Sequence, residues 1–329
     1  MVASLAPPPE SDLSRRENAG FLVSTTFVCL ASVRDVYLGD IFQRVSPPLV
    51  AMLAFVLGSA IFLTVGLVGA RQSFPILWEE RRTLFWVNIS TASAWIMFLY
   101  ALKLIEPSIV QVLYSGIGPL SVNWIEGSVL TAAPKIRLTT AERLSFVALA
   151  VTLLLAIALV RMGWSGWGQM SVGRASLGLC LAAFGGISIS ISTMLCRKLN
   201  DAGVAPSALL AFRFPMTIAA AAALAALSPS GIPRSFSWID PLVVVAAVLI
   251  VVPNYINQLA ISLASPLTVR VVLAVAPVLI FILQIPEGRL TTSPYSVVVA
   301  LLYGVAAVAV AATRGWAIRT INEAPMGAA

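Results

Sequence analysis

The side chains of this chain that could bind a small polar molecule are amides, arginines and aromatic residues set among apolar neighbours. Asn254, Asn257 and Gln258 are spaced i, i+3 and i+4, which places three amides on one helix face. Such a face can form a wall that exchanges hydrogen bonds with a substrate. It can equally join packed helices, because Asn and Gln bond across helix interfaces in membranes. The sequence leaves both interpretations open.

Arginine supplies chemistry for an anionic group, because its guanidinium forms charge-assisted bonds to carboxylates and phosphates. Arg270 stands near the start of one apolar stretch, at the end of the bundle where Asn257 is also expected. We therefore predict that Arg270 and the amides form one polar cluster. The other interpretation is that Arg270 reaches out to the membrane surface along its apolar stem. The same two interpretations are open for Arg213, and the family resemblance given below favours the second for it.

A second candidate face carries Gln111, Tyr114 and Ser115, followed one turn later by Gly118. Tyr114 offers an aromatic wall and a hydroxyl, and Gly118 lets a helix or ligand approach closely. Trp95, from another stretch, is a further aromatic candidate for the substrate site. Helix packing alone would also explain this face. The serines at 188, 190 and 192 are weaker candidates, because alternate positions do not share one helix face.

Arg34 and Asp35 are candidates for energy coupling, because ionisable side chains inside a membrane are costly and usually functional. Adjacent helix positions point about 100° apart, so we do not expect these two side chains simply to face one another. Asp35 could load and release a proton, and the competing interpretation is an ion pair with Arg34 or a neighbour. Glu106 precedes Pro107 and is interpreted as the cap of a helix N-terminus.

The sequence contains few of the residue types and motifs that catalysis or cofactor binding requires. The sequence contains no histidine, which removes imidazole catalysis, histidine-ligated metals and Ser-His-Asp triads. Cys29, Cys180 and Cys196 lack metal-ligand spacing. The Gly-Ile-Gly run at 116–118 has no strand before it and is not a nucleotide fingerprint. We expect a protein that is not an enzyme and that needs no cofactor or metal.

The elements that must position these residues are long apolar stretches. The chain is 59% hydrophobic and 11% charged, whereas a soluble protein has about 25% charged residues. About 20 helical residues cross a bilayer of roughly 30 Å, and the runs are too long and too uniform for a β-barrel. Ten such stretches are predicted, at 20–38, 48–69, 84–101, 107–124, 144–160, 175–195, 207–227, 242–261, 266–283 and 294–312.

Short echoes divide the ten stretches into two halves. Val45, Pro47 and Phe55 are repeated at one offset by Val204, Pro206 and Phe214. An odd number of helices per half inserts the second half upside down. The predicted fold is therefore all-α integral membrane, with ten transmembrane helices as a 5+5 inverted repeat. Its predicted parts are a disordered cytoplasmic tail at 1–19, repeats at 20–161 and 175–312, a connector at 162–174 and a cytoplasmic tail at 313–329.

The basic residues predict the orientation of the chain. The net charge is +7, but the Lys and Arg residues are scattered in short loops rather than gathered in a stripe, which argues against a nucleic-acid partner. Placing both termini in the cytoplasm puts twelve of them inside and six outside, with three within helices. We expect a multi-pass protein of the cell (inner) membrane whose partners are lipid and a small-molecule substrate.

Several short motifs resemble the drug/metabolite transporter superfamily, in particular its ten-helix EamA-type branch. They sample residues 20–312 and comprise Ser46-Pro47, Ala205-Pro206, Phe212-Arg213-Phe214, Pro119, Pro277, Glu126-Gly127 with Arg137-Leu138-Thr139-Thr140, and Glu287-Gly288-Arg289-Leu290-Thr291-Thr292. Two features depart from the family: the first helix lacks a Trp-Gly pair, and Ala54 stands where the repeat has Arg213.

The resemblance implies a transporter of small organic metabolites such as amino acids, purines, nucleotide sugars or sugar phosphates, often moving them outward. It also implies a cavity lined mainly by the first, third, fourth, sixth, eighth and ninth helices. Export of amino-acid-like compounds by alternating access is the favoured function, with a proton or a counter-substrate as coupling partner. Exchange of organophosphates or nucleotide sugars is the second hypothesis, and a non-transporting scaffold or lipid-handling protein is the third. Substrate identity, coupling and oligomeric state are not readable from the sequence.

Overall fold

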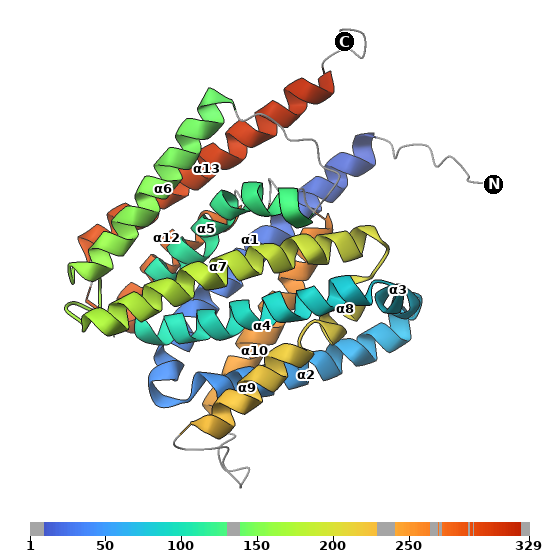
Figure 1. Cartoon of the computed structure of the whole chain (residues 1–329), viewed down its shortest axis with the longest axis horizontal. Coiled ribbons are helices and arrows are strands. Elements are labelled where there is room, and N and C mark those ends of the chain that lie inside the picture. The colour runs from blue at the N-terminus through green and yellow to red at the C-terminus, as the bar shows by residue number, and fades with distance from the viewer. Residues whose placement is uncertain are drawn as a thin grey trace.

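The computed structural model describes residues 10–129, 139–228, 241–263, 269, 272–288, 290–291 and 293–323, and in these ranges the regular structure is helical without strands. The helices are α1 (Glu10–Arg44), α2 (Pro47–Gly69), α3 (Ser73–Glu79), α4 (Arg81–Leu104), α5 (Pro107–Val129), α6 (Thr140–Arg161), α7 (Val172–Asp201), α8 (Pro206–Phe212), α9 (Pro215–Leu227), α10 (Pro241–Leu263), α12 (Ala276–Glu287) and α13 (Pro294–Glu323). Figure 1 shows their arrangement.

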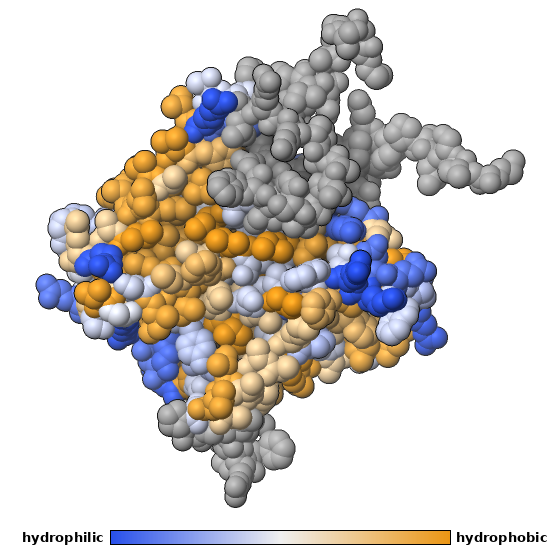
Figure 2. All heavy atoms as spheres, in the orientation of Figure 1, coloured by the Kyte–Doolittle hydropathy of each residue, from blue (hydrophilic) through white to orange (hydrophobic). Residues whose placement is uncertain are grey.

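Within the described ranges, eight spans are long and apolar enough to cross a membrane, with α8 and α9 counted as one span. The surface agrees with this property. Val68 is 83% exposed, Val305 71% and Leu154 64%, which would be unfavourable in water but suits lipid. Figure 2 shows the apolar residues of one face gathered between polar groups at opposite ends of the molecule. The protein is therefore a helical bundle with a membrane-facing surface.

The helices pack in recurring pairs. α4 lies along α7, α1 along α10, and α6 along α13, as Figure 1 shows for the first and third pairs. α2 packs against both α8 and α9, α5 packs against α7 and α12, and α12 also contacts α1. The largest apolar core joins these pairs through fully buried side chains that include Phe42, Phe55, Phe98, Leu113 and Phe214. The core therefore sits where α2, α4, α5 and α8 to α9 meet.

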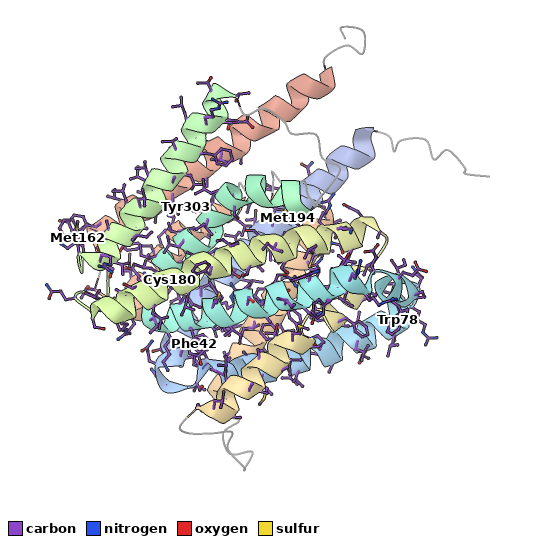
Figure 3. All side chains as sticks on the ribbon, in the orientation of Figure 1. Phe42, Trp78, Met162, Cys180, Met194 and Tyr303 are labelled. Carbon is purple, nitrogen blue, oxygen red and sulfur yellow. The ribbon has the colours of Figure 1, made fainter. Side chains whose placement is uncertain are left out.

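Two opposite ends of the bundle are used as references below. At the connector end, α4 turns into α5, α6 is joined to α7 by residues 162–171, and α12 leads to α13. At the α3 end, α2 leads through α3 to α4, and α7 turns into α8. Met162 and Trp78 mark these two ends in Figure 3. In Figure 1, α1 begins and α13 ends towards the side on which α3 lies.

The stretch expected as one helix at 207–227 is broken. α8 ends at Phe212 and α9 begins at Pro215, whose ring has no N–H to donate and disfavours a helical residue before it. Asn88 of α4 covers the gap, because its Nδ2 donates to the Phe212 carbonyl at 2.8 Å and its Oδ1 accepts from the Met216 N–H at 3.3 Å. The break is therefore supported by a neighbouring helix and leaves Arg213 in the bundle interior.

Other helix boundaries differ less from the ranges predicted from the sequence. α1 begins at Glu10, so residues 10–19 are helical rather than a disordered tail, and α13 runs on to Glu323, into the segment expected as a tail. α7 begins at Val172, which shortens the connector to 162–171. α3 was not expected. Helix starts follow simple rules: Pro occupies the first turn of several helices, and Thr139 and Glu142 form a reciprocal capping box on α6.

Candidate functional site

The most unusual polar group in the bundle is Arg213, at the break between α8 and α9. Its Nε donates to Thr91 Oγ1 of α4 at 3.0 Å, its Nη2 to Ser192 Oγ of α7 at 3.0 Å, and its Nη1 to Gln258 Oε1 of α10 at 3.2 Å. The Thr91 and Ser192 hydroxyls are also bonded to each other at 2.7 Å. These four residues, from α4, α7, α10 and the break between α8 and α9, are called the Arg213 centre below.

The Arg213 centre carries a buried positive charge. Arg213 is 3% exposed, and Thr91, Ser192 and Gln258 are fully buried. Among the residues that the structure describes, no carboxylate lies within ion-pair distance of Arg213. A buried charge is costly unless it is paired, and all three of its hydrogen-bond partners are neutral. The expectation that Arg213 reaches the membrane surface is therefore wrong.

Two of the three predicted amides belong to this region. Gln258 is in the Arg213 centre, but its Nε2 has no hydrogen-bond partner, and neither has Nδ2 of Asn254, one turn earlier on α10. Both side chains are buried, whereas Asn257 is only half-buried. The Arg213 centre and the adjacent Asn254 therefore hold one uncompensated cation and two amide donors without an acceptor. Arg270, the cation expected beside these amides, lies outside the described residues.

Arg34 and Asp35 form an ion pair with each other, which is the competing interpretation of the sequence, although adjacent helix positions point about 100° apart. Arg34 Nε donates to Asp35 Oδ1 at 2.7 Å in a buried ion pair, because the long arginine stem bends back across the helix surface. The guanidinium of Arg34 lies over Trp95 at 5.3 Å and over Phe98 at 5.5 Å from the ring centroids. Asp35 Oδ2 is buried without a hydrogen-bond partner. This pair is electrically neutral, unlike Arg213.

An aromatic strip connects the two charged groups. Trp95 meets Phe55 edge to face at 5.1 Å, and Phe55 stacks on Phe214 at 4.6 Å with the rings 29° apart. Phe214 in turn lies 5.9 Å from the guanidinium carbon of Arg213. Trp95, an aromatic candidate for the substrate site, thus belongs to a continuous row of rings that runs from Arg34 to Arg213.

Only part of the predicted face on α5 lies beside the aromatic strip. Tyr114 is half-buried and packs against Phe98 at 4.6 Å between ring centroids, which places it beside the aromatic strip. Gln111 is buried. Ser115 shares a 2.7 Å hydrogen bond with the Tyr303 hydroxyl of α13, so it joins two helices rather than lining a site. Gly118 allows α7 to approach, since a Cβ there would meet Ser190 Oγ at 2.5 Å.

Glu106 does more than cap α5. Its carboxylate is buried at the connector end and accepts four hydrogen bonds, from Ser108 Oγ, the Gly166 N–H, Gln284 Nε2 of α12 and Ser296 Oγ of α13, at 2.6 to 3.1 Å. It therefore ties α5, the connector, α12 and α13 together. Donors that face a carboxylate satisfy its charge without a cation.

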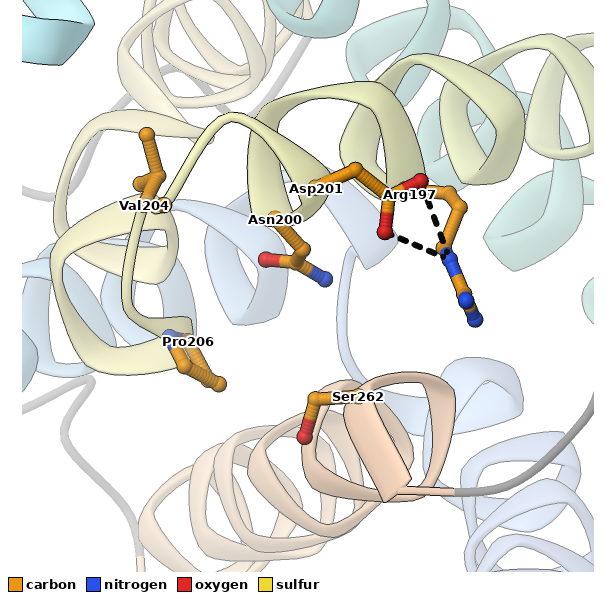
Figure 4. A pocket seen from close by; sticks show the side chains of 7 residues that line it. Arg197, Asn200, Asp201, Val204, Pro206 and Ser262 are labelled. Atoms are coloured by element: carbon orange, nitrogen blue, oxygen red, sulfur yellow. Dashed lines mark hydrogen bonds and ion pairs between the residues drawn. The ribbon is translucent and has the colours of Figure 1, made fainter. Parts of the chain in front are cut away.

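A cavity of about 220 Å³ opens at the α3 end, between α7, the start of α8 and α10. Figure 4 shows its lining, with Asn200, Ser262 and the Arg197–Asp201 ion pair at 3.0 Å. The same helices carry Ser192, Arg213 and Gln258. Since Ser262 follows Gln258 by one turn on α10, about 6 Å along the axis, the cavity lies directly towards the α3 end from the Arg213 centre.

Thr91 was missed from the sequence, and Ser192 was rated a weak candidate. A signal for Thr91 exists, because Asn88, Thr91 and Trp95 follow at i, i+3 and i+7 and so share one face of α4. All three contact the break or the aromatic strip. Ordinary helix packing also produces a face of this kind. Because the residues opposite it are not known from the sequence, the sequence does not distinguish a binding face from a packing face.

Comparisons with known proteins bear on the fold alone. No protein-family model matches the sequence, and no curated protein matches it. Nineteen chains of solved structures resemble the fold. One of them, described as "Crystal structure of protein", aligns with a TM-score of 0.60 and 20% sequence identity over 93% of this chain and 100% of its own. The chain therefore shares its fold with known structures across nearly its whole length.

Proposed function

We propose that this protein is a secondary transporter that exports small organic metabolites across the cell membrane. The observation that carries the proposal is Arg213, a buried and uncompensated cation at a broken helix in the bundle interior. Intramembrane charges are expensive and mark substrate pathways. Broken helices serve the same purpose in many transporters, because they expose polar backbone only where it faces a site.

Alternating access between two inverted five-helix halves is the proposed mechanism, and the packing pattern supports it. If α1, α2, α4, α5 and α6 correspond to α7, α8 with α9, α10, α12 and α13, the contact of α4 with α7 maps onto that of α10 with α1. The contact of α5 with α7 maps likewise onto α12 with α1, and α6 with α13 onto itself. Phe55 and Phe214, equivalent in the sequence echo, stack on each other as residues near a two-fold axis would.

The cavity at the α3 end supports uptake from that side. Assigning the α3 end to the cytoplasm places both termini inside and agrees with the larger number of basic residues there. A solute would then enter between α7, α8 and α10 and move towards Arg213. Asp35, with one carboxylate oxygen unpartnered, is the proposed site of proton coupling together with Arg34. A counter-substrate is the other proposed driving partner.

Amino-acid-like substrates fit this interior better than polyanions. Of the buried arginines, Arg34 is neutralised by Asp35, which leaves Arg213 as the cation without an ion pair among the residues described. One net positive charge matches one carboxylate, whereas organophosphates and nucleotide sugars call for several convergent cations. We accordingly propose membership of the drug/metabolite transporter superfamily, with amino-acid-like compounds as substrates and organophosphate exchange as the second candidate.

The test is substrate flux into proteoliposomes that contain the purified protein, measured with a panel of labelled amino acids, sugar phosphates and nucleotide sugars, with and without a proton gradient or internal counter-substrate. We expect flux of an amino acid to fall at least about tenfold in Arg213→Gln, because one charge-assisted contact is lost. Arg44→Gln, at an exposed arginine paired with Asp40, is the matched control and should keep its flux. Absence of flux for every class under every gradient would favour a non-transporting scaffold.

A further inference from the structure

Two hydroxyl groups occupy one edge of the Arg213 guanidinium. Its Nε and Nη2 each donate to a hydroxyl at 3.0 Å, and the two hydroxyl oxygens, from Thr91 and Ser192, are 2.7 Å apart. In a bidentate arginine–carboxylate pair, two parallel N–H groups donate to the two oxygens of one planar group. The hydroxyl pair therefore stands where the two oxygens of a carboxylate would bind.

We infer that the Arg213 centre is a carboxylate-binding site in which the carboxylate of the solute displaces the Thr91 and Ser192 hydroxyls from the guanidinium. This inference rests on the proposed function, because it identifies the chemical group that the transported solute must carry. It assigns the binding to Arg213 as the residue that contacts the solute. Thr91 and Ser192 hold the guanidinium in place while the site is empty.

Electrostatics explains why a carboxylate would replace the hydroxyls. Hydrogen bonds between ionised partners are about twice as strong as those to neutral groups. The hydroxyls satisfy the two N–H groups but leave the charge of Arg213 uncompensated in a buried place. A carboxylate accepts from both N–H groups and also compensates the charge. The Thr91 and Ser192 hydroxyls can still bond to each other once they are released, so displacement strands no buried group.

The amides beside the centre need the same kind of group. Gln258 Nε2 and Asn254 Nδ2 are buried donors without acceptors, and they lie one turn apart on α10. Buried polar groups in folded proteins are normally paired. A solute rich in acceptor atoms would supply what both amides lack, whereas a cationic or purely donating solute would not.

The helices that form the site indicate how it opens. Ser192 and Gln258 belong to α7 and α10, and Arg213 directly follows α8; α7, α10 and the start of α8 surround the cavity at the α3 end. Thr91 belongs to α4. A displacement of α4 together with α7 away from the break would remove both hydroxyls from Nε and Nη2 while they stay bonded to each other, and Gln258 would continue to hold Nη1.

The surroundings also describe the body of the solute. Phe214 lies beside the guanidinium, and Phe55 and Trp95 continue from it as a row of rings. These rings offer apolar and aromatic contact next to the carboxylate position. Benzoate, a carboxylate on a flat apolar ring, is therefore a suitable probe, and benzamide is its uncharged match. Inorganic phosphate distinguishes a carboxylate site from a general anion site.

The test is the thermal unfolding midpoint of the purified full-length protein at constant ionic strength, titrated with each of the three probes. A ligand that binds the folded state raises this midpoint. We expect benzoate to raise it clearly more than benzamide or phosphate. Arg213→Gln should weaken the apparent benzoate affinity at least about tenfold, the loss of one charge-assisted pair, whereas Arg44→Gln should leave it unchanged.

Thr91→Val separates displacement from a merely structural network. If the hydroxyls give way to the carboxylate, this variant should bind benzoate with an affinity within about threefold of the original chain or tighter, well short of a tenfold change. The inference is overturned if benzoate does no more than benzamide in the unmodified chain, if phosphate exceeds benzoate, if Arg213→Gln keeps the effect, or if Thr91→Val loses it. Flux in proteoliposomes with no benzoate effect would reject this inference and leave the proposed function standing.

Discussion

At the residue scale, the Arg34–Asp35 pair, Glu106 and Arg213 are buried charged groups of the described bundle, and each has different surroundings. Arg34 and Asp35 neutralise each other. Glu106 has no such partner but accepts four hydrogen bonds and sits at the positive end of α5. Arg213 makes bonds only to neutral acceptors. Its charge is therefore the one of the three that neither an ion pair nor donors of opposite polarity compensate, which is why a ligand is expected there.

The Arg34–Asp35 pair makes a quantitative prediction. Asp35→Asn removes the counter-charge and leaves Arg34 as an unpaired buried cation, a change that costs about 3–5 kcal/mol in proteins. We expect a loss of that size in the free energy of unfolding, measured by denaturation of the purified protein. Asp40→Asn, which breaks the exposed Arg44–Asp40 pair, should cost less than about 1 kcal/mol.

A double variant provides the check on that prediction. Arg34→Met in the Asp35→Asn background removes the stranded charge while keeping an apolar stem over Trp95 and Phe98, so it should recover most of the lost stability. Equal stability of Asp35→Asn and the original chain would mean that Arg34 finds another partner or reaches water. The buried pair would then not be a stabilising unit.

Sequence reasoning identified most polar residues of the interior but not their partners. Arg213 was assigned to the surface because a position in a regular helix says nothing of the hydroxyls and amide that surround it. Those partners, Thr91, Ser192 and Gln258, come from three other helices. Arg34 and Asp35 were judged by backbone direction alone, which neglects the reach of a long flexible stem. Pairings of this kind are set by packing rather than by local periodicity.

At the element scale, apolar length predicted where helices occur, because a membrane requires the backbone to bond within its own segment. It did not predict the break before Pro215. Prolines alone are a poor guide here, since Pro119 and Pro253 lie inside α5 and α10 without ending either helix. Pro215 differs because Asn88 on α4 bonds to the freed backbone on both sides of it. The break thus depends on a neighbouring helix.

Close contact between α5 and α7 depends on glycine. A Cβ at Gly186 would collide with the Tyr114 carbonyl oxygen, a backbone atom that cannot move aside without shifting α5. Gly186→Ala should therefore destabilise the protein by about 1–3 kcal/mol, as overpacking does. Chemical denaturation of the purified protein measures the effect.

Gly173, in the first turn of the same helix, is the matched control for Gly186. A Cβ there meets nothing within 4 Å, so Gly173→Ala should be neutral or slightly stabilising through helix propensity. Equal stability of Gly186→Ala and Gly173→Ala would mean that α5 and α7 do not pack as closely as the contact at Gly186 indicates. Flux should fall with Gly186→Ala as well, because Tyr114 and the aromatic strip would be displaced together.

At the scale of the whole molecule, the two ends are built differently. The connector end is fastened by the Glu106 hydrogen bonds and by the Thr291 N–H and hydroxyl, which both donate to the Gly166 carbonyl. The α3 end contains the 220 Å³ cavity, and it is also held across helices by Arg197 Nη1 bonding to the Ile261 carbonyl at 3.1 Å and by the Ala205 N–H bonding to Ser73 Oγ at 3.0 Å. Under the proposed function, a closed connector end and a cavity open at the α3 end would be one of the states of alternating access. Which compartment the cavity faces depends on orientation.

Orientation is therefore the last quantity to measure. Gln72, in the turn before α3, and Gln169, in the connector, are both exposed and lie at opposite ends of the chain's membrane spans. In a background with Cys29, Cys180 and Cys196 replaced by alanine, a membrane-impermeant maleimide added to intact cells should label Gln169→Cys but not Gln72→Cys. Permeabilised cells should label both. The opposite pattern would place the α3 end, its cavity and both termini outside and would contradict the proposed orientation, while labelling of both sites in intact cells would contradict a spanning bundle.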